Sequence, residues 1–83
     1  MSTKITLTPK TGAFTALRAY VNGSPVINTM GGTGTWEGVA ASVEVKAVGV
    51  AGSELDCTVK GDTLQHSATH ILDSNGRLDV KLP

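Results

Sequence analysis

Apolar and polar residues alternate along several short stretches of this chain, the pattern of β-strands that bury one face and expose the other. In ELDCTVK (54–60) every second residue is apolar, with Cys57 in the middle of the apolar set. KITLT (4–8) and RLDVKL (77–82) follow the same rule. We therefore predict three one-sided strands in these places, and we expect residues 1–10 to include an extended N-terminal arm.

Two further stretches are apolar in a less regular way. The stretch AFTALRAYVNG (13–23) has apolar residues on both faces of a strand, which predicts a strand that is covered from both sides. In SVEVKAVGV (42–50) the apolar residues change face near Ala47. One extra residue in a strand moves all later side chains to the opposite face, so this change predicts a β-bulge near Ala47.

Turn signals recur at short intervals between these stretches. Asn22-Gly23 is typical of a type I′ hairpin turn, and Pro25 after it favours an edge strand. Further turns are predicted at residues 31–34, 51–53, 60–62 and 73–76. The pattern predicts an all-β fold: one domain over residues 1–83, a small antiparallel β-sandwich of seven or eight short strands.

The stretch from Asp62 to Leu72 admits two interpretations. Its apolar residues have helical spacing, and Asp62 with Gln65 resembles a capping box. Its Thr, Ser and His residues are weak helix formers, however, and a helix of about ten residues needs good packing. We expect a strand here, with a short helix at 63–72 as the alternative.

Composition narrows the classes of function. The 83 residues carry 7 basic and 7 acidic side chains, so the chain lacks the positive field that nucleic-acid binding needs. Low net charge permits self-association or docking onto a protein assembly. The N-terminal stretch lacks the apolar run of a signal peptide, and no stretch is apolar enough for a membrane span. We expect a protein made in the cytoplasm, without a membrane partner, that can become part of a virion or a secreted machine.

Candidate chemistry is sparse. On a strand, His66 and His70 point to the same face about 13 Å apart at ~3.3 Å per residue, too far to share a metal ion. On a helix they would be neighbours one turn apart and could chelate, but no HExxH pattern or Cys pair supplies a third ligand. The single Cys57 has no disulfide partner and is expected to be a buried thiol with a raised pKa. Ser67 lacks a glycine-flanked elbow, and a tight turn explains the acidic residues near Asp73 without calcium. We expect no enzyme activity, no metal and no cofactor.

Trp36 is the most informative single side chain. A lone tryptophan in a small domain is usually packed between two sheets. The alternative is an aromatic platform that binds a glycan, with Tyr20 as a second ring.

The stretches TWEGVAASVEVKAVGV, ELDCTVK and DSNGRLDVKLP resemble immunoglobulin-like and fibronectin-like β-sandwich domains in their strand lengths and turns. Small sandwiches without secretion signals are similar in kind to decorating or stabilising subunits of phage capsids and tails. The resemblance implies a non-enzymatic structural subunit that docks on a larger assembly. The alternatives are a carbohydrate-binding module and a proteinaceous inhibitor of a larger complex. The candidate contact residues are Pro9, Arg18, Tyr20, Pro25 and Trp36.

Overall fold

The computed structural model describes residues 2–61 and 65–82, which form eight β-strands. The strands are β1 (Thr3–Thr11), β2 (Phe14–Val21), β3 (Ser24–Thr29), β4 (Gly34–Gly38), β5 (Val43–Gly49), β6 (Glu54–Lys60), β7 (Gln65–Ile71) and β8 (Arg77–Leu82). No helix is present in these two ranges, so none there is long and apolar enough to cross a membrane. The predicted all-β fold is confirmed.

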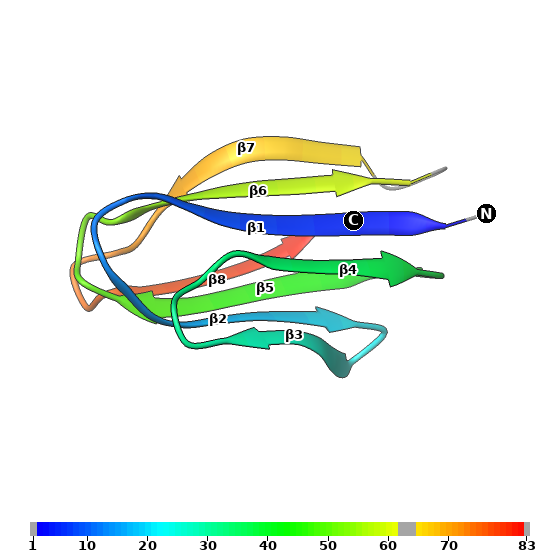
Figure 1. The fold of residues 1–83 in the computed structure, drawn as a ribbon, viewed down its shortest axis with the longest axis horizontal. Coiled ribbons are helices and arrows are strands. Elements are labelled where there is room, and N and C mark those ends of the chain that lie inside the picture. Colours follow the sequence, from blue (N-terminus) through cyan, green and yellow to red (C-terminus); the bar gives the residue numbers. More distant parts are fainter. Residues whose placement is uncertain (1, 62–64, 83) are drawn as a thin grey trace.

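The strands form two antiparallel four-stranded sheets that stack on each other (Figure 1). The first sheet has the order β4-β1-β6-β7 and the second the order β3-β2-β5-β8. The hairpins β2–β3 and β6–β7 stay within one sheet, whereas every other connection crosses to the other sheet. Edge strands therefore come in two pairs, β3 beside β4 and β7 beside β8.

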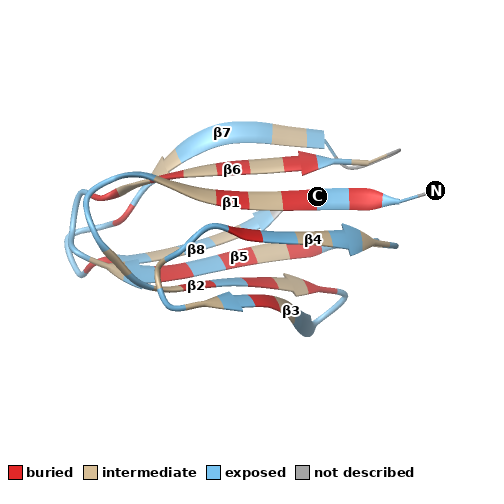
Figure 2. Cartoon of the chain, viewed as in Figure 1, coloured by how far each residue is buried: buried red, intermediate tan, exposed pale blue. Residues whose placement is uncertain are grey.

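The core lies between the inner faces of the two sheets. Figure 2 shows buried and less buried residues alternating along β1, β2, β5 and β6, as a one-sided strand requires. The buried apolar residues are Ile5, Leu7, Leu17, Ala19, Val21, Ile27, Val43, Val45, Ala47, Leu55, Cys57, Val59 and Leu72. The four central strands supply most of this set, so they hold the fold together.

The expected N-terminal arm is wrong for the residues of β1. This strand begins at Thr3 and pairs with β4 on one side and β6 on the other, so it is a central strand. Ile5 and Leu7 are fully buried. Residues 3–10 are therefore part of the core sheet and are not a separate contact segment.

The predicted bulge is present on the neighbouring strand and not on β5. Phe14 pairs with Gly49 and Ala16 with Val48, so Thr15 is the extra residue of β2. Because of this extra residue, Phe14 lies on the inner face and packs against the core. β5 keeps its phase against β8, and Val48 lies on the outer face.

The outer face of β2 carries Arg18 and Tyr20, and no other strand or helix of the described residues covers it. The prediction of a strand covered from both sides is therefore wrong. The bulge turns Phe14 inward, whereas Ala16 and Tyr20 stay on the outer face.

The turn between β2 and β3 also fixes a connection between the two sheets. Asn22 and Gly23 both have positive φ, 52° and 85°, as the predicted type I′ turn requires. The Asn22 side-chain oxygen also accepts hydrogen bonds from the backbone N–H groups of Ala41 and Ser42, at 3.0 and 3.1 Å. The hairpin β2–β3 therefore holds the β4–β5 connection in place.

At the opposite end of the sandwich, Ser53 is a buried hydrogen-bonding centre. Its hydroxyl accepts a hydrogen bond from the Ala13 N–H and donates one to the Ala13 carbonyl. Its backbone carbonyl accepts the N–H of Leu72. Three crossing connections thus meet at one serine.

The segment 65–71 is the strand β7, and the alternative of a helix at 63–72 is wrong for these residues. β7 pairs with β6 from Gln65 to Ile71 without a register shift. Asp62 of the proposed capping box lies outside the described residues, as do Thr63 and Leu64.

We predict that Leu7→Ala lowers the free energy of unfolding by about 2–5 kcal/mol, because it removes a side chain with 0% exposure from the centre of the core. Val50→Ala is the control, since Val50 is 61% exposed and its truncation should cost within about 0.5 kcal/mol. Urea unfolding followed by circular dichroism measures both. Equal losses in the two variants would contradict a core centred on β1.

Candidate functional site

The four edge strands differ in how they are protected against pairing with another chain. Unpaired edges attract foreign strands, and natural proteins block them with charged residues, proline, bulges or very short strands. β3 contains Pro25 and a register shift, and β4 has only 5 residues. β8 carries Arg77, Asp79 and Lys81 on one face. Each of these three edges has at least one protective feature.

β7 has none of these features. It is 7 residues long, pairs with β6 in continuous register, and contains no charged residue, no proline and no glycine. Figure 2 shows that it is also the least buried of the long strands. Among the strands of the described residues, β7 is thus the one whose backbone edge is open to another strand.

The two faces of β7 are chemically different. The outer face carries Gln65, Ser67, Thr69 and Ile71, which pair with the polar outer residues of β6. There the Thr69 hydroxyl donates a 2.6 Å hydrogen bond to the Asp56 carboxylate. The inner face carries His66, Ala68 and His70, opposite the buried residues Val59, Cys57 and Leu55. The inner face of this edge strand is therefore polar where a central strand would be apolar.

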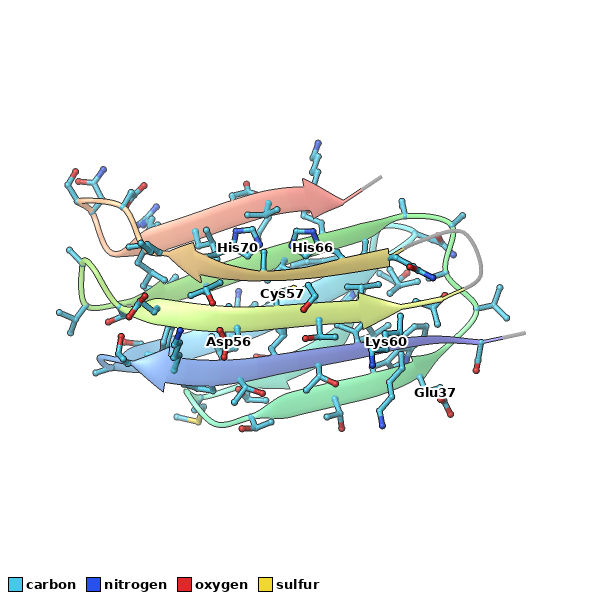
Figure 3. All side chains as sticks on the ribbon, turned by 90° about the horizontal axis from the view of Figure 1, so that it is seen from above. Glu37, Asp56, Cys57, Lys60, His66 and His70 are labelled. Atoms are coloured by element: carbon cyan, nitrogen blue, oxygen red, sulfur yellow. The ribbon has the colours of Figure 1, made fainter. Side chains whose placement is uncertain are left out.

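The two imidazole rings meet over Ala68. Their Nε2 atoms are 2.9 Å apart, the ring planes are within 13°, and the ring centres are 5.1 Å apart. The distance between the ring centres exceeds the distance between the Nε2 atoms by about two ring radii, one for each imidazole. The two centres and the two Nε2 atoms therefore lie nearly on one line. Each Nε2 therefore points at the other, and the rings lie head to head in nearly one plane. Figure 3 shows both histidines on β7, on the side of β8.

This geometry corrects the distance argument made from the sequence. The spacing of about 13 Å describes the backbone positions of residues four apart on a strand. The side chains of His66 and His70 lean toward each other across Ala68, whose small methyl group leaves them room. The argument that a strand keeps the two imidazoles apart is therefore wrong.

A contact of 2.9 Å between two ring nitrogens is a hydrogen bond in which one Nε2 carries the hydrogen and the other accepts it. The neutral pair satisfies this with one ring in each tautomer. If both rings were protonated, two cations would face each other. Burial and the charge on His66 accordingly lower the pKa of His70.

Cys57 lies on β6 directly opposite Ala68 and is buried. Burial raises the pKa of its thiol to about 11, so the thiol stays protonated at neutral pH. The expected role of Cys57 as a small buried hydrophobe is confirmed.

Polar clusters elsewhere have structural uses. Ser67 points to the outer face of β7, away from the two histidines. One oxygen of the Asp73 side chain accepts the backbone N–H groups of Asn75 and Arg77, which closes the predicted turn. In the described ranges, no three His, Cys, Asp or Glu side chains come together in a metal-binding arrangement.

Three of the contact residues predicted from the sequence lie on the outer face of the second sheet. Arg18 is exposed, and Tyr20 is half-buried with the Lys46 ammonium 5.6 Å from its ring centre. Pro25 pairs with Tyr20 at the edge, as predicted for an edge strand. A shallow groove of about 290 Å³ begins at Arg18 and continues past Arg77 to Asp79. The structure therefore brings Arg18, Tyr20 and Pro25 together.

The other two predicted residues face inward. Pro9 is half-buried in β1 and pairs with Leu55. Trp36 pairs with Ile5, packs partly buried against the core and lies over Gly38. Trp36 and Tyr20 are thus on different sheets and do not form a common platform.

Sequence reasoning missed β7 as a site, because a polar inner face hides the alternation that marks a strand. Two signals could have revealed it. The segment has no charged residue, and HSATH (66–70) has nearly the same order of residue types in both directions.

We predict that the stability of the protein falls as the pH drops below about 6.5, in part through His70. The pKa of His70 is lower in the folded protein than its ordinary value of 6.5, so the unfolded chain takes up the proton first. The contribution of neutral His70 to the stability of the fold is complete above the pKa of the unfolded chain. It is lost as the pH falls toward and through the lower pKa of the folded protein. Thermal unfolding in chelator between about pH 7.5 and 5 should show a shallower decline in Tm for His70→Gln than for the wild type. Parallel curves would contradict this role of the histidine pair.

Comparison of the chain with protein-family models, curated proteins and solved structures finds no match.

Proposed function

We propose that this protein is a non-enzymatic interaction module that joins a larger protein assembly through the backbone edge of β7. The observation that carries the proposal is the difference between the four edges: β3, β4 and β8 are each protected, whereas β7 is long, regular and uncharged. A strand of this kind is the usual template for addition of a partner's strand.

The chemistry of β7 suits this mode of binding. Main-chain hydrogen bonds supply affinity in strand addition, and side chains on alternate faces supply specificity. On the outer face a partner strand would meet the hydroxyl groups of Ser67 and Thr69, and on the inner face the imidazoles of His66 and His70. Since the chain has a formal net charge of zero, long-range repulsion does not oppose the approach of a second protein.

The proposal extends the resemblance to immunoglobulin-like sandwiches and to subunits that decorate phage particles. Such a subunit needs a rigid scaffold and one surface for docking. The fully packed central strands provide the scaffold, and the outer faces of both sheets leave room for further contacts, for example at Arg18 and Tyr20. The assembly that we propose is of the kind found in a virus particle or an injection machine.

The carbohydrate-binding alternative stays a prediction. It needs aromatic rings on one exposed surface, and the half-buried, inward placement of Trp36 does not favour it.

We predict that Ser67→Lys with Thr69→Lys weakens association by about tenfold or more, because charges on an edge strand block strand addition. The matched control is Thr6→Lys with Thr8→Lys, which places the same charges two residues apart on the outer face of the central strand β1. Sedimentation velocity measures self-association and binding to assemblies isolated from the native source.

The control pair should leave association within about twofold of the wild type. Equal binding by the edge variant and the wild type would contradict the proposal. So would a wild-type protein that neither self-associates nor binds such assemblies.

A further inference from the structure

The sequence of β7 is nearly symmetric about Ala68. His66 and His70 are equally distant from it on the inner face, and Ser67 and Thr69 on the outer face. Two copies of a strand that pair across a two-fold axis must present the same patch to each other. With Ala68 opposite Ala68 of a second copy, each His66 faces a His70 and each Ser67 faces a Thr69. The strand therefore complements itself without a charge clash.

Such a pair would gather four imidazoles. Within one chain the two Nε2 atoms are already 2.9 Å apart above Ala68. Side chains directly opposite in an antiparallel pair have Cβ atoms about 4.5–5.5 Å apart. The two head-to-head pairs would then lie side by side on the inner face, and their four Nε2 atoms could converge on one point once each ring turns from the head-to-head line toward the two-fold axis.

The donor set and its surroundings fit a zinc ion. Zinc prefers four ligands in a tetrahedron, and imidazole nitrogens bind it at about 2.0–2.1 Å. One chain supplies only two such nitrogens, which is half of a complete site. Metal binding requires neutral rings with the hydrogen on Nδ1, and a shift of one tautomer in the head-to-head pair provides this without loss of a proton.

Charged groups near the pair point away from it. On β6, Asp56 and Lys60 lie on the outer face, while the residues facing inward beside the histidines are Leu55, Cys57 and Val59. On β8, Arg77, Asp79 and Lys81 lie on the outer face, and Leu78 and Val80 pack against the core. Among the described residues of β6 and β8, those that share the inner face with the two imidazoles are therefore uncharged.

We propose that β7 pairs with β7 of a second copy about a two-fold axis at Ala68, and that the two His66–His70 pairs together bind one Zn²⁺ ion. This inference depends on the proposed function of β7 as the contact edge, and it names both the partner and the ion that strengthens the contact. Neither the symmetry of the strand nor the convergence of the imidazoles follows from the need for a stable monomer.

The test combines sedimentation velocity with zinc titration of chelator-treated protein. Four forms are compared: the wild type, His66→Gln with His70→Gln, Ser67→Lys with Thr69→Lys, and the β1 control Thr6→Lys with Thr8→Lys. The wild type and the β1 control should bind one zinc per two chains and dimerise at least about tenfold more tightly with zinc than without it. Thermal unfolding verifies that each variant is folded.

The histidine variant should lose zinc binding and keep the weaker association seen in chelator. The edge variant should lose the two-chain stoichiometry. Zinc bound at one ion per monomer, or dimerisation that does not respond to zinc, would overturn the inference. If the wild type associates equally well with and without zinc, the zinc site fails while the β7 contact stands. If it associates in neither condition and binds no other assembly, both proposals fail.

Discussion

Burial of the inner faces of β1, β2, β5 and β6 against one another is the interaction on which the rest of the structure depends. Each of these strands has one apolar face, and only stacking of two sheets removes all four faces from water. The fully buried Ile5, Leu7, Leu17 and Leu55 lie at the centre of this contact. A sandwich of this kind leaves two strands of each sheet at an edge. The surface therefore differs from edge to edge mainly in how each edge strand is protected against pairing with another chain.

Different residues close the core at the β3–β4 side and at the β7–β8 side. On the β3–β4 side, Trp36 covers the core and Pro25 interrupts the backbone edge. On the β7–β8 side, Leu78 and Val80 of β8 extend the core, and the inner face of β7 carries two imidazoles where apolar side chains would be expected. A polar group is costly to bury without a partner, and His66 and His70 reduce this cost by bonding to each other. This side of the sandwich is therefore the one where stability alone does not explain the choice of residues.

Much of the fold could be predicted from the sequence, because strand alternation and turn residues are local signals. Cys57 in its alternating strand and the Asn22-Gly23 turn are found where the pattern indicates. The errors arise where tertiary context decides. A bulge at Thr15 explains why Phe14 points inward, whereas the local pattern suggested a bulge near Ala47. The N-terminal residues become a central strand only because β4 and β6 pair with them on both sides.

The candidate site was hidden for a related reason. The contact between the two histidines depends on side-chain direction, which the spacing of backbone positions does not give. The importance of β7 depends on its place at the end of the sheet, which is set by long-range pairing. What the sequence could show was the lack of charge in this segment and its near symmetry about Ala68.

Amide hydrogen exchange of β7 at protein concentrations below and above the onset of association tests the central claim most directly. If β7 is the contact edge, the amides within Gln65–Ile71 that point away from β6 become protected on association, and the amides of β3, β4 and β8 keep their rates. Protection that appears at β3 or β8 while β7 continues to exchange freely would contradict the account.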